Sequence, residues 1–199
     1  METFSIRKSN EKRYLSTFYY STYLIMKKIL FLLTICLFFI TSCSKEKQFD
    51  EKLKVAYQEM SNTLISSTIH CAVTTLTWKT AIYENKTPSG KYCSNFNEAL
   101  DELSEGYRKN GILDTLYVSM KRMQTATSKL NNPPSSRKEC YNDFIDIVAD
   151  VSSYYRMAIA PSGSLNTYDN QRMEAEESIS KKIDMFKIKY AEIIKIDEK

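Results

Sequence analysis

The chain has little of what most catalytic and ligand-binding motifs are built from. Its 199 residues include four glycines and a single histidine, His70. One histidine excludes a zinc site with two or three histidine ligands, and no two cysteines have Cys-x-x-Cys spacing. Glycine-rich phosphate loops, the G-x-S-x-G nucleophile turn and the EF-hand pattern are absent as well. We therefore predict no metal, no cofactor and no enzymatic activity.

Basic charge is also missing from most of the chain. The formal net charge is +4, but residues 1–42 carry six Lys/Arg and two Asp/Glu, which accounts for all of it. Residues 43–199 carry 22 basic and 22 acidic residues. A protein that binds nucleic acid normally gathers a basic excess on one face. The sequence therefore predicts no nucleic-acid partner.

The longest apolar run, residues 29–40, is interrupted only by Thr34 and Cys36. It is too short for a membrane-spanning helix, which needs roughly 20 apolar residues. Its length, and the pair Lys27 and Lys28 before it, are typical of a signal peptide. The residues that follow, Ile40-Thr41-Ser42-Cys43, resemble the lipobox of bacterial lipoproteins.

That resemblance implies cleavage between Ser42 and Cys43, and lipid attachment to Cys43. The chain would then be held on a membrane through its lipid anchor. Ser44, rather than Asp, follows the lipid-bearing cysteine. By resemblance to lipoprotein sorting in Gram-negative bacteria, this favours the outer membrane and leaves open whether the domain faces the periplasm or the outside.

Four divisions of the chain follow from this interpretation. Residues 1–25 precede a signal that is already complete, and we expect them to be a mis-annotated upstream extension, with translation starting at Met26. Residues 26–42 form the lipoprotein signal peptide, residues 43–48 a short lipidated tether, and residues 49–199 the helical domain, which is long enough for one core.

Three clusters of proline, glycine and asparagine divide the domain into four segments, near residues 88–90, 131–134 and 161–163. Each segment has helical periodicity, and none shows the two-residue alternation of a strand. The predicted helices cover about 47–85, 95–130 with a break at Gly111, a third from Ser135 or Ser136 to Ala160, and a fourth from Ser164 or Asn166. Short connections between long helices predict an all-α, antiparallel, up-down four-helix bundle.

Two rows of apolar residues run along the first predicted helix. The row Phe49, Leu53, Ala56, Met60 and Leu64 has the step of three and four that indicates a core-facing stripe. The row Ile65, Ile69, Ala72 and Leu76 is expected to widen that stripe. The sequence thus predicts that both rows are buried.

Charged residues and cysteines are interpreted structurally. Asp143, Asp146 and Asp150 are predicted to form a solvated face, and the acidic group Glu174, Glu176 and Glu177 a surface feature near a helix start. In the predicted bundle the cysteines Cys71, Cys93 and Cys140 lie at different heights. We therefore predict no disulfide among them, since a bridge needs Cα atoms within about 7 Å.

The remaining feature is aromatic. Trp78, Tyr154 and Tyr155 form a candidate binding face, although plain packing would use the same residues. The favoured function is non-enzymatic: an envelope lipoprotein that binds or scaffolds another envelope protein. The alternative is a bundle that binds or senses a small ligand in a cleft between its first and third helices, lined by Tyr and Trp.

Overall fold

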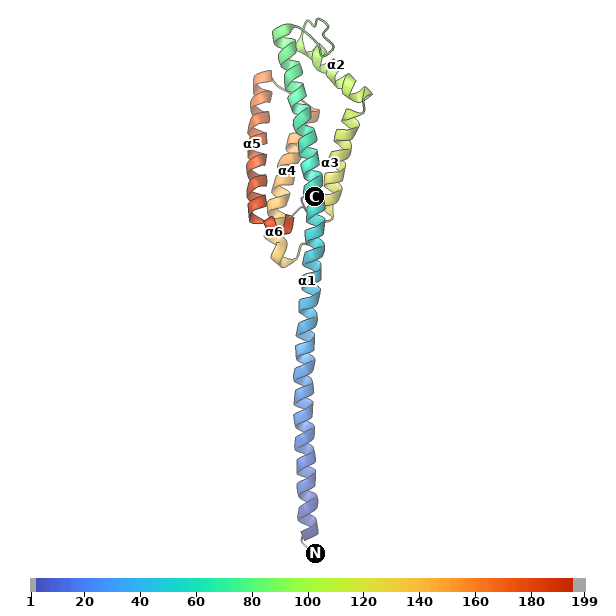
Figure 1. Cartoon of the computed structure of the whole chain (residues 1–199), viewed down its shortest axis with the longest axis vertical. Helices are drawn as coiled ribbons and strands as arrows, with labels where there is room; N and C mark the ends of the chain where they lie inside the picture. The colour runs from blue at the N-terminus through green and yellow to red at the C-terminus, as the bar shows by residue number, and fades with distance from the viewer. Residues whose placement is uncertain (1–2, 195–199) are drawn as a thin grey trace. The chain divides into compact units, whose positions relative to one another are not determined.

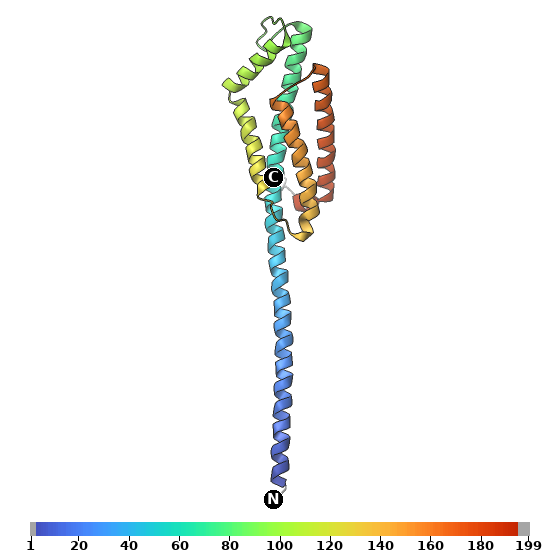
Figure 2. The same cartoon turned by 180° about the vertical axis from the view of Figure 1, so that it is seen from behind.

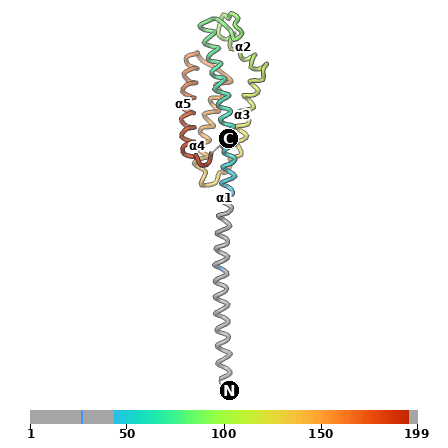
Figure 3. The backbone as a smooth tube through the Cα atoms, viewed as in Figure 1, coloured from blue at the N-terminus to red at the C-terminus, as the bar shows by residue number. Residues whose placement is uncertain are grey.

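The protein is all-helical. The computed structural model describes the backbone of residues 3–194 and the side chains of Lys27 and residues 44–194. The chain divides into two compact units, Met1–Lys45 and Glu46–Lys199. The first contains only the beginning of the first helix, and the second contains everything that follows, drawn in colour in Figure 3. All of the contacts below lie in the second unit.

Six α-helices and one short 3-10 helix make up the described backbone. They are α1 (Thr3–Glu84), α2 (Phe96–Lys109), α3 (Ile112–Ser128), a 3-10 helix (Ser135–Arg137), α4 (Lys138–Ile159), α5 (Leu165–Lys189) and α6 (Ala191–Ile194). The only strand-like pairing in this range is one isolated bridge, between Lys86 and Tyr92 in the loop after α1. The prediction of a chain without a sheet is confirmed over these residues.

The helices of the second unit lie side by side. Across Figure 1 the order is α5, α4, α1 and α3, and Figure 2 shows the same order reversed from behind. Contacts fix the directions of two pairs. Lys182 of α5 pairs with Asp150 of α4, and Lys189 pairs with Glu139, so α4 and α5 are antiparallel. Tyr57 stacks on Phe186 and Trp78 contacts Tyr168, which makes α1 antiparallel to α5.

One core joins these helices. Its fully buried members come from α1, α3, α4 and α5 and from the turn after α3, and include Leu53, Met60, Trp78, Met123, Leu130, Phe144, Val151, Tyr168 and Ile179. A smaller cluster of Ala81, Cys93 and Ala99, with Phe96 against it, closes the end where α1 passes into α2. Apolar burial of this extent is what stabilises helices that are individually marginal in water.

Most predicted helix boundaries are confirmed, although α1 begins at Thr3 and not near residue 47. The helices end near the three breaker clusters, and Gly111 interrupts the second segment with a φ of 69° in the left-handed region that suits glycine. Ser164 caps α5 by accepting a hydrogen bond from the backbone N–H of Thr167. Asn95 caps α2 in the same way, accepting from the N–H groups of Asn97 and Glu98.

One local prediction is wrong. Ser135 and Ser136 do not cap α4, because both lie in the 3-10 helix and the chain passes from it into α4 with no extended residue between. Ser136 instead donates a hydrogen bond to Glu46 of α1 over 2.7 Å. Residues 45–48, part of the predicted lipidated tether, are helical and belong to α1.

The cysteines agree with the prediction. Cys71, Cys93 and Cys140 are free thiols, and each is buried. None of them is presented to solvent at the surface of the second unit.

Candidate functional site

The most unusual surface of the second unit is the outward side of α1. Ile65, Ile69 and Leu76 are 58%, 60% and 64% exposed, although their neighbours on the same helix form the core. Ala72 lies between them and is exposed as well. We call these four residues the outward row. Its exposure corrects the sequence prediction, which placed it in the core beside Phe49 and Leu53.

Helix geometry explains the correction. Successive residues of an α-helix are turned by about 100°, so residues three or four apart share a side. Both rows have that spacing, but the outward row is offset by about half a turn from the row of Leu53 and Met60. The core of α4 and α5 covers only one side of α1, and the opposite side is left in solvent.

The outward row lies in a stretch without formal charge. Residues 63–78 contain no Asp, Glu, Lys or Arg, whereas solvated helix faces are usually charged. Seven of these residues are Ser or Thr, and the buried Thr63 and Ser67 satisfy their hydroxyls on backbone carbonyls four residues earlier. An apolar side without charges around it marks a binding surface more often than single exposed apolar residues do.

A groove of about 540 Å³ adjoins the outward row between α1 and α3. Ile65 and Val118 provide its apolar part, and Val118 is 42% exposed. Glu59, Asp114 and Arg122 supply charges of both signs along it. The apolar surface of α1 therefore continues sideways onto α3.

A second groove, of about 420 Å³, lies between α4 and α5. Ile147 and Phe186 are buried beneath it, and Met185 and Ile188 beside it are 62% and 81% exposed. Charged side chains that line it are paired across the two helices: Lys189 contacts Asp143 over 2.8 Å, and Lys182 contacts Asp150 nearby over 2.7 Å. Such a volume lies in the range of small-molecule sites.

These pairs correct the interpretation of the α4 carboxylates. Asp143 accepts hydrogen bonds from Lys189 and from the hydroxyl of Tyr190, and both lower the pKa of Asp143. Burial, together with that hydrogen bond to Asp143, raises the pKa of Tyr190 to about 12. Asp143 and Asp150 thus join two helices and are not merely a solvated face, as the sequence had suggested.

A polar cluster lies between α1, α4 and α5, with Tyr154 buried, Asp169, Arg172 and Glu176 half-buried, and Lys79 exposed. The hydroxyl of Tyr154 donates to Glu176, whose carboxylate also accepts from Arg172 over 2.9 Å. Arg172 contacts Asp169, which in turn pairs with Lys79 of α1 over 2.9 Å. The predicted acidic surface feature is exposed at Glu174 and Glu177, whereas Glu176 is half-buried and joins α4 to α5.

The thiol of Cys71 is placed beside this cluster and is fully buried. Burial raises the pKa of Cys71, although Tyr168 and Tyr154 hydrogen-bond to its sulfur. Burial likewise raises the pKa of Cys140 to about 12. Reactive cysteines are thiolates in exposed, electropositive surroundings, so these two thiols have the properties of packing residues.

His70 also belongs to the interior. Its ring lies 4.5 Å from the ring of Tyr107 in α2, and its Nδ1 has no hydrogen-bond partner among the described residues. Burial lowers the pKa of His70, so the neutral imidazole is favoured. The described part of the chain has no cluster of His, Cys, Asp and Glu that would hold a metal ion.

The predicted binding face is not at the surface. Trp78, Tyr154 and Tyr155 are 2%, 1% and 7% exposed. Large aromatic side chains at helical spacing contribute the most apolar area, and here that area fills the core. Tyr154 does reach the wall of a smaller groove between α4 and α5, of about 280 Å³. The apolar residues that are exposed belong to the outward row around Ile69, which the sequence predicted to be buried.

The predicted lipid site lies outside the described side chains. Ser42 and Cys43 fall there, as does the signal peptide of residues 26–42 apart from Lys27, whose side chain is exposed. Among the residues that were described, no helix combines the length and the apolar character needed to cross a membrane.

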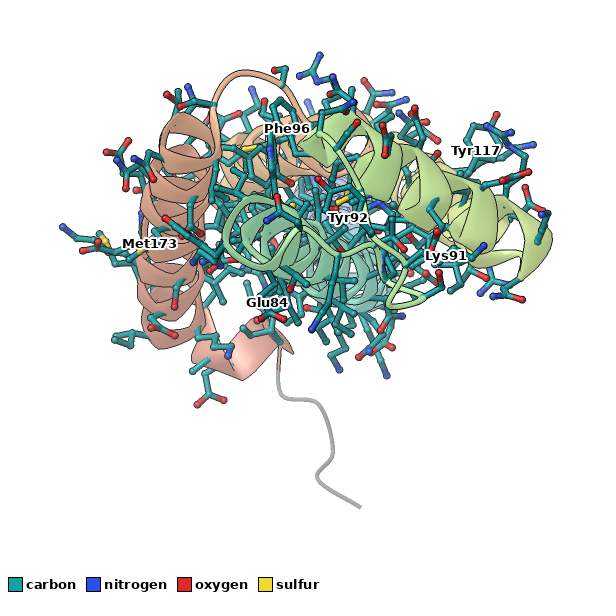
Figure 4. All side chains as sticks on the ribbon, turned by 90° about the horizontal axis from the view of Figure 1, so that it is seen from above. Glu84, Lys91, Tyr92, Phe96, Tyr117 and Met173 are labelled. Carbon is teal, nitrogen blue, oxygen red and sulfur yellow. The ribbon has the colours of Figure 1, made fainter. Side chains whose placement is uncertain are left out.

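Figure 4 shows all described side chains in a view onto the Glu84 end of α1. Met173 lies on the outer side of α5 and Tyr117 on the opposite flank of the unit, while Tyr92 lies over the end of α1. Met173 and Tyr117 are isolated apolar residues, 56% and 63% exposed, of the kind found on any protein surface. Among the described side chains, those of α1 are where exposed apolar residues recur over several turns of one helix side in a stretch without charge.

Comparisons with known proteins give no further guidance: no protein-family model, no curated protein and no solved structure matches the chain.

Proposed function

We propose that the chain is a lipoprotein of a Gram-negative cell envelope, with lipid on Cys43, whose helices form an up-down four-helix bundle that binds another envelope protein. In that bundle α2 and α3 together occupy one position. The observation that carries the binding function is the outward row of α1, an exposed apolar side in a stretch of 16 residues without formal charge.

A protein partner fits this surface better than a small molecule does. The outward row from Ile65 to Leu76 spans eleven residue steps, roughly 16 Å at a rise of about 1.5 Å per residue. It is convex, since it is the ridge of one helix, whereas small ligands need concave sites that cover most of their surface. An amphipathic partner helix can cover such a ridge with its own apolar side.

The lipid anchor is tested separately. In a Gram-negative host that expresses the full chain, mass spectrometry of the purified protein should find Cys43 as the acylated first residue. Cys43→Ala should then be released from the membrane fraction, because two or three acyl chains provide stable anchoring. An unacylated Cys43 inside an intact chain would contradict the lipoprotein proposal and leave the binding surface to be tested alone.

The binding surface is tested by photocrosslinking in intact cells. A photoreactive residue in place of Ile69 should capture a protein, whereas the same residue in place of Met173, which is exposed to a similar degree, should not. If both positions give the same products, or neither gives any, the binding function assigned to the outward row is wrong.

The groove between α4 and α5 supports a second candidate function, the binding of a small ligand. The groove would suit a molecule with an apolar part and a charged part. Its floor is apolar, formed by Ile147 and Phe186, and its rim carries charged pairs such as Lys189 with Asp143. A compound that raises the melting temperature of the chain, and no longer does so in Ile188→Glu, would favour this candidate. The exposed position of Ile188 makes that substitution compatible with folding.

A further inference from the structure

The outward side of α1 has the spacing of a coiled-coil seam. Asn62, Ile65, Ile69, Ala72 and Leu76 follow alternating steps of three and four, and all five are exposed. The same steps reach Val55 in one direction and Tyr83 in the other, through Gln58 and Lys79. Their period of 3.5 residues is that of helices that pack along one another over several turns.

A polar residue of the seam, Asn62, lies where it would determine how two paired helices are aligned along their length. Asn62 occupies the layer next to Ile65, and a single asparagine in such a layer favours pairing with an asparagine of the facing helix. Within one chain the side-chain oxygen of Asn62 accepts a hydrogen bond from Gln58 over 3.3 Å, and its amide nitrogen can donate to a facing asparagine. Opposite an unrelated apolar helix, that amide nitrogen would be desolvated.

The residues that flank the seam allow a second helix to approach. Ser61 and Thr68 lie on one flank and Ser66 and Val73 on the other, so α1 itself places no charge and no large side chain beside the central layers. The nearest charges from another helix are Asp114 and Arg122 of α3, which line the groove next to Ile65. The first charges on the flanks are Lys54 and Glu59. In a parallel pair in register, flanking residues five positions apart face each other across the seam, and Lys54 of each helix meets Glu59 of the other.

Antiparallel pairing fits these residues less well. With Ile69 of one helix beside Ala72 of the other, Lys54 falls level with Thr87 and Glu59 with Ile82, so neither charge meets an opposite charge. The parallel arrangement instead places identical residues together and forms two equivalent ion pairs between Lys54 and Glu59. Anchoring of both chains to one membrane through Cys43 also favours helices that run in the same direction.

We infer that the partner of the outward row is a second copy of this chain, paired in parallel and in register through α1. The inference rests on the proposed function, because it names the partner of the surface described there. The self-association is isologous: each copy presents the same seam, and a two-fold axis runs along it.

Disulfide trapping in the full, membrane-bound chain tests the arrangement. Val55→Cys places a thiol in the seam, far enough from its centre for parallel and antiparallel pairs to differ. Only the parallel pair brings the two introduced thiols within the reach of a disulfide, for which Cα atoms must lie within about 7 Å. The native thiols Cys71, Cys93 and Cys140 are buried and should contribute no background.

Under mild oxidation, Val55→Cys should run at twice the chain mass on a non-reducing gel, and reductant should return it to the single mass. Met173→Cys is the matched control, since both positions are 56% exposed and Met173 lies on α5. Leu76→Glu, added to Val55→Cys, should abolish the dimer because it places two like charges in one layer, and an unchanged melting temperature would show that the fold is intact. Val55→Cys that stays monomeric, or that dimerises no more than Met173→Cys, would overturn the parallel pair.

The photocrosslink at Ile69 separates this inference from the proposed function. A product at twice the chain mass that contains only this sequence supports self-association. A product with a different envelope protein overturns self-association and leaves the binding function standing. With no product at all, both are wrong.

Discussion

The two sides of α1 between residues 49 and 83 differ in surroundings more than in composition. The inward side has Leu53 and Met60 fully buried, while the outward side has Leu76 64% exposed. Both sides carry apolar residues at steps of three and four. The inward side is covered by helices of the same chain, and the outward side is apolar without such cover.

The spacing of apolar residues along a helix shows which of its sides are apolar. It does not show whether other parts of the chain pack against those sides. A helix that is apolar on two opposite sides either lies inside a larger core or binds something on one side. In this unit there are too few helices to surround α1. The uncovered apolar side is therefore the surface on which the proposed binding function rests, and the covered side is a matter of stability.

The largest expected difference between the two sides is in core packing. Leu53→Ala and Leu76→Ala are the same substitution on the same helix. Leu53→Ala should lower the free energy of unfolding by about 2 to 5 kcal/mol, because it removes a fully buried side chain and leaves a cavity. Leu76→Ala should change the stability of the folded unit by no more than roughly 0.5 kcal/mol. Urea unfolding in mild detergent, followed by circular dichroism, measures both.

If the outward side pairs as inferred, that second value should grow with protein concentration, since a dimer is stabilised by mass action. If Leu53→Ala and Leu76→Ala lower the free energy of unfolding equally at every concentration, the two sides of α1 are buried to the same extent. The proposed difference between them would then be wrong.

The next effect concerns the polar cluster on the inward side. Glu176→Ala removes the acceptor of Tyr154 and Arg172. Leaving a buried hydroxyl and a guanidinium without it should cost about 1 to 3 kcal/mol of unfolding free energy. Glu174→Ala, an exposed position on the same helix, is the control and should have almost no effect. The melting temperatures of the two variants decide between a structural and a surface role for Glu176.

A smaller effect is expected at the edge between the two sides. Arg137 donates two hydrogen bonds to Asp50, of 2.9 and 3.0 Å, and both side chains are only partly exposed. Arg137→Ala should lower the free energy of unfolding by about 1 to 2 kcal/mol, because hydrogen bonds to charged groups contribute more stability than hydrogen bonds between neutral groups. The control is Lys109→Ala, which removes the exposed pair with Glu105 and should cost almost nothing. A similar decrease in the free energy of unfolding of both variants, measured in urea, would show that the half-buried ion pair is no more stabilising than the exposed one.

The smallest effect is a pH dependence at His70. Burial lowers the folded-state pKa of His70 below its ordinary value of 6.5. The unfolded chain therefore binds the proton first as the pH falls, and stability that is present above pH 6.5 is lost as the pH drops toward the folded pKa. Melting temperatures measured from about pH 7.5 to about pH 5 should decline, and the decline should be smaller in His70→Phe, which keeps a ring against Tyr107.

The carboxylates provide the internal control for that measurement. Hydrogen bonds from Lys189 and from Lys79 lower the pKa values of Asp143 and Asp169, so the stability that these groups contribute is lost only at more acidic pH. When the measurement is extended below about pH 4, that part of the curve should be the same in both proteins. Curves that are parallel down to pH 5 would show that His70 does not titrate between the two states.

Much of the fold could be predicted from the sequence. Breaker residues near Gly90, Pro133 and Gly163 mark the ends of helices by local chemistry, since proline cannot continue a helix and glycine adopts positive φ. Ser164 as a cap, Gly111 as a break and the absence of strands follow from similar local rules. The resemblance of residues 40–43 to a lipobox is also a local pattern, and it stays a prediction.

The candidate site could not be predicted in the same way. Trp78, Tyr154 and Tyr155 were expected to form a binding face and are buried, whereas Ile65 and Ile69 were expected in the core and are exposed. The heptad steps from Asn62 to Leu76 were a signal that could have found the seam, because a second stripe opposite the first is more than one core needs.

By itself the sequence determined where α2 and α5 begin and where α1, α3 and α4 end, because capping, chain breaking and apolar spacing act over a few residues. Only the tertiary structure decided which side of α1 is covered, which carboxylates join helices and which aromatics fill the core. The physical reason is that burial depends on neighbours distant in the chain. Ile69 and Met60 have similar apolar surface, and only the positions of α4 and α5 decide that Met60 is buried and that Ile69 remains at the surface.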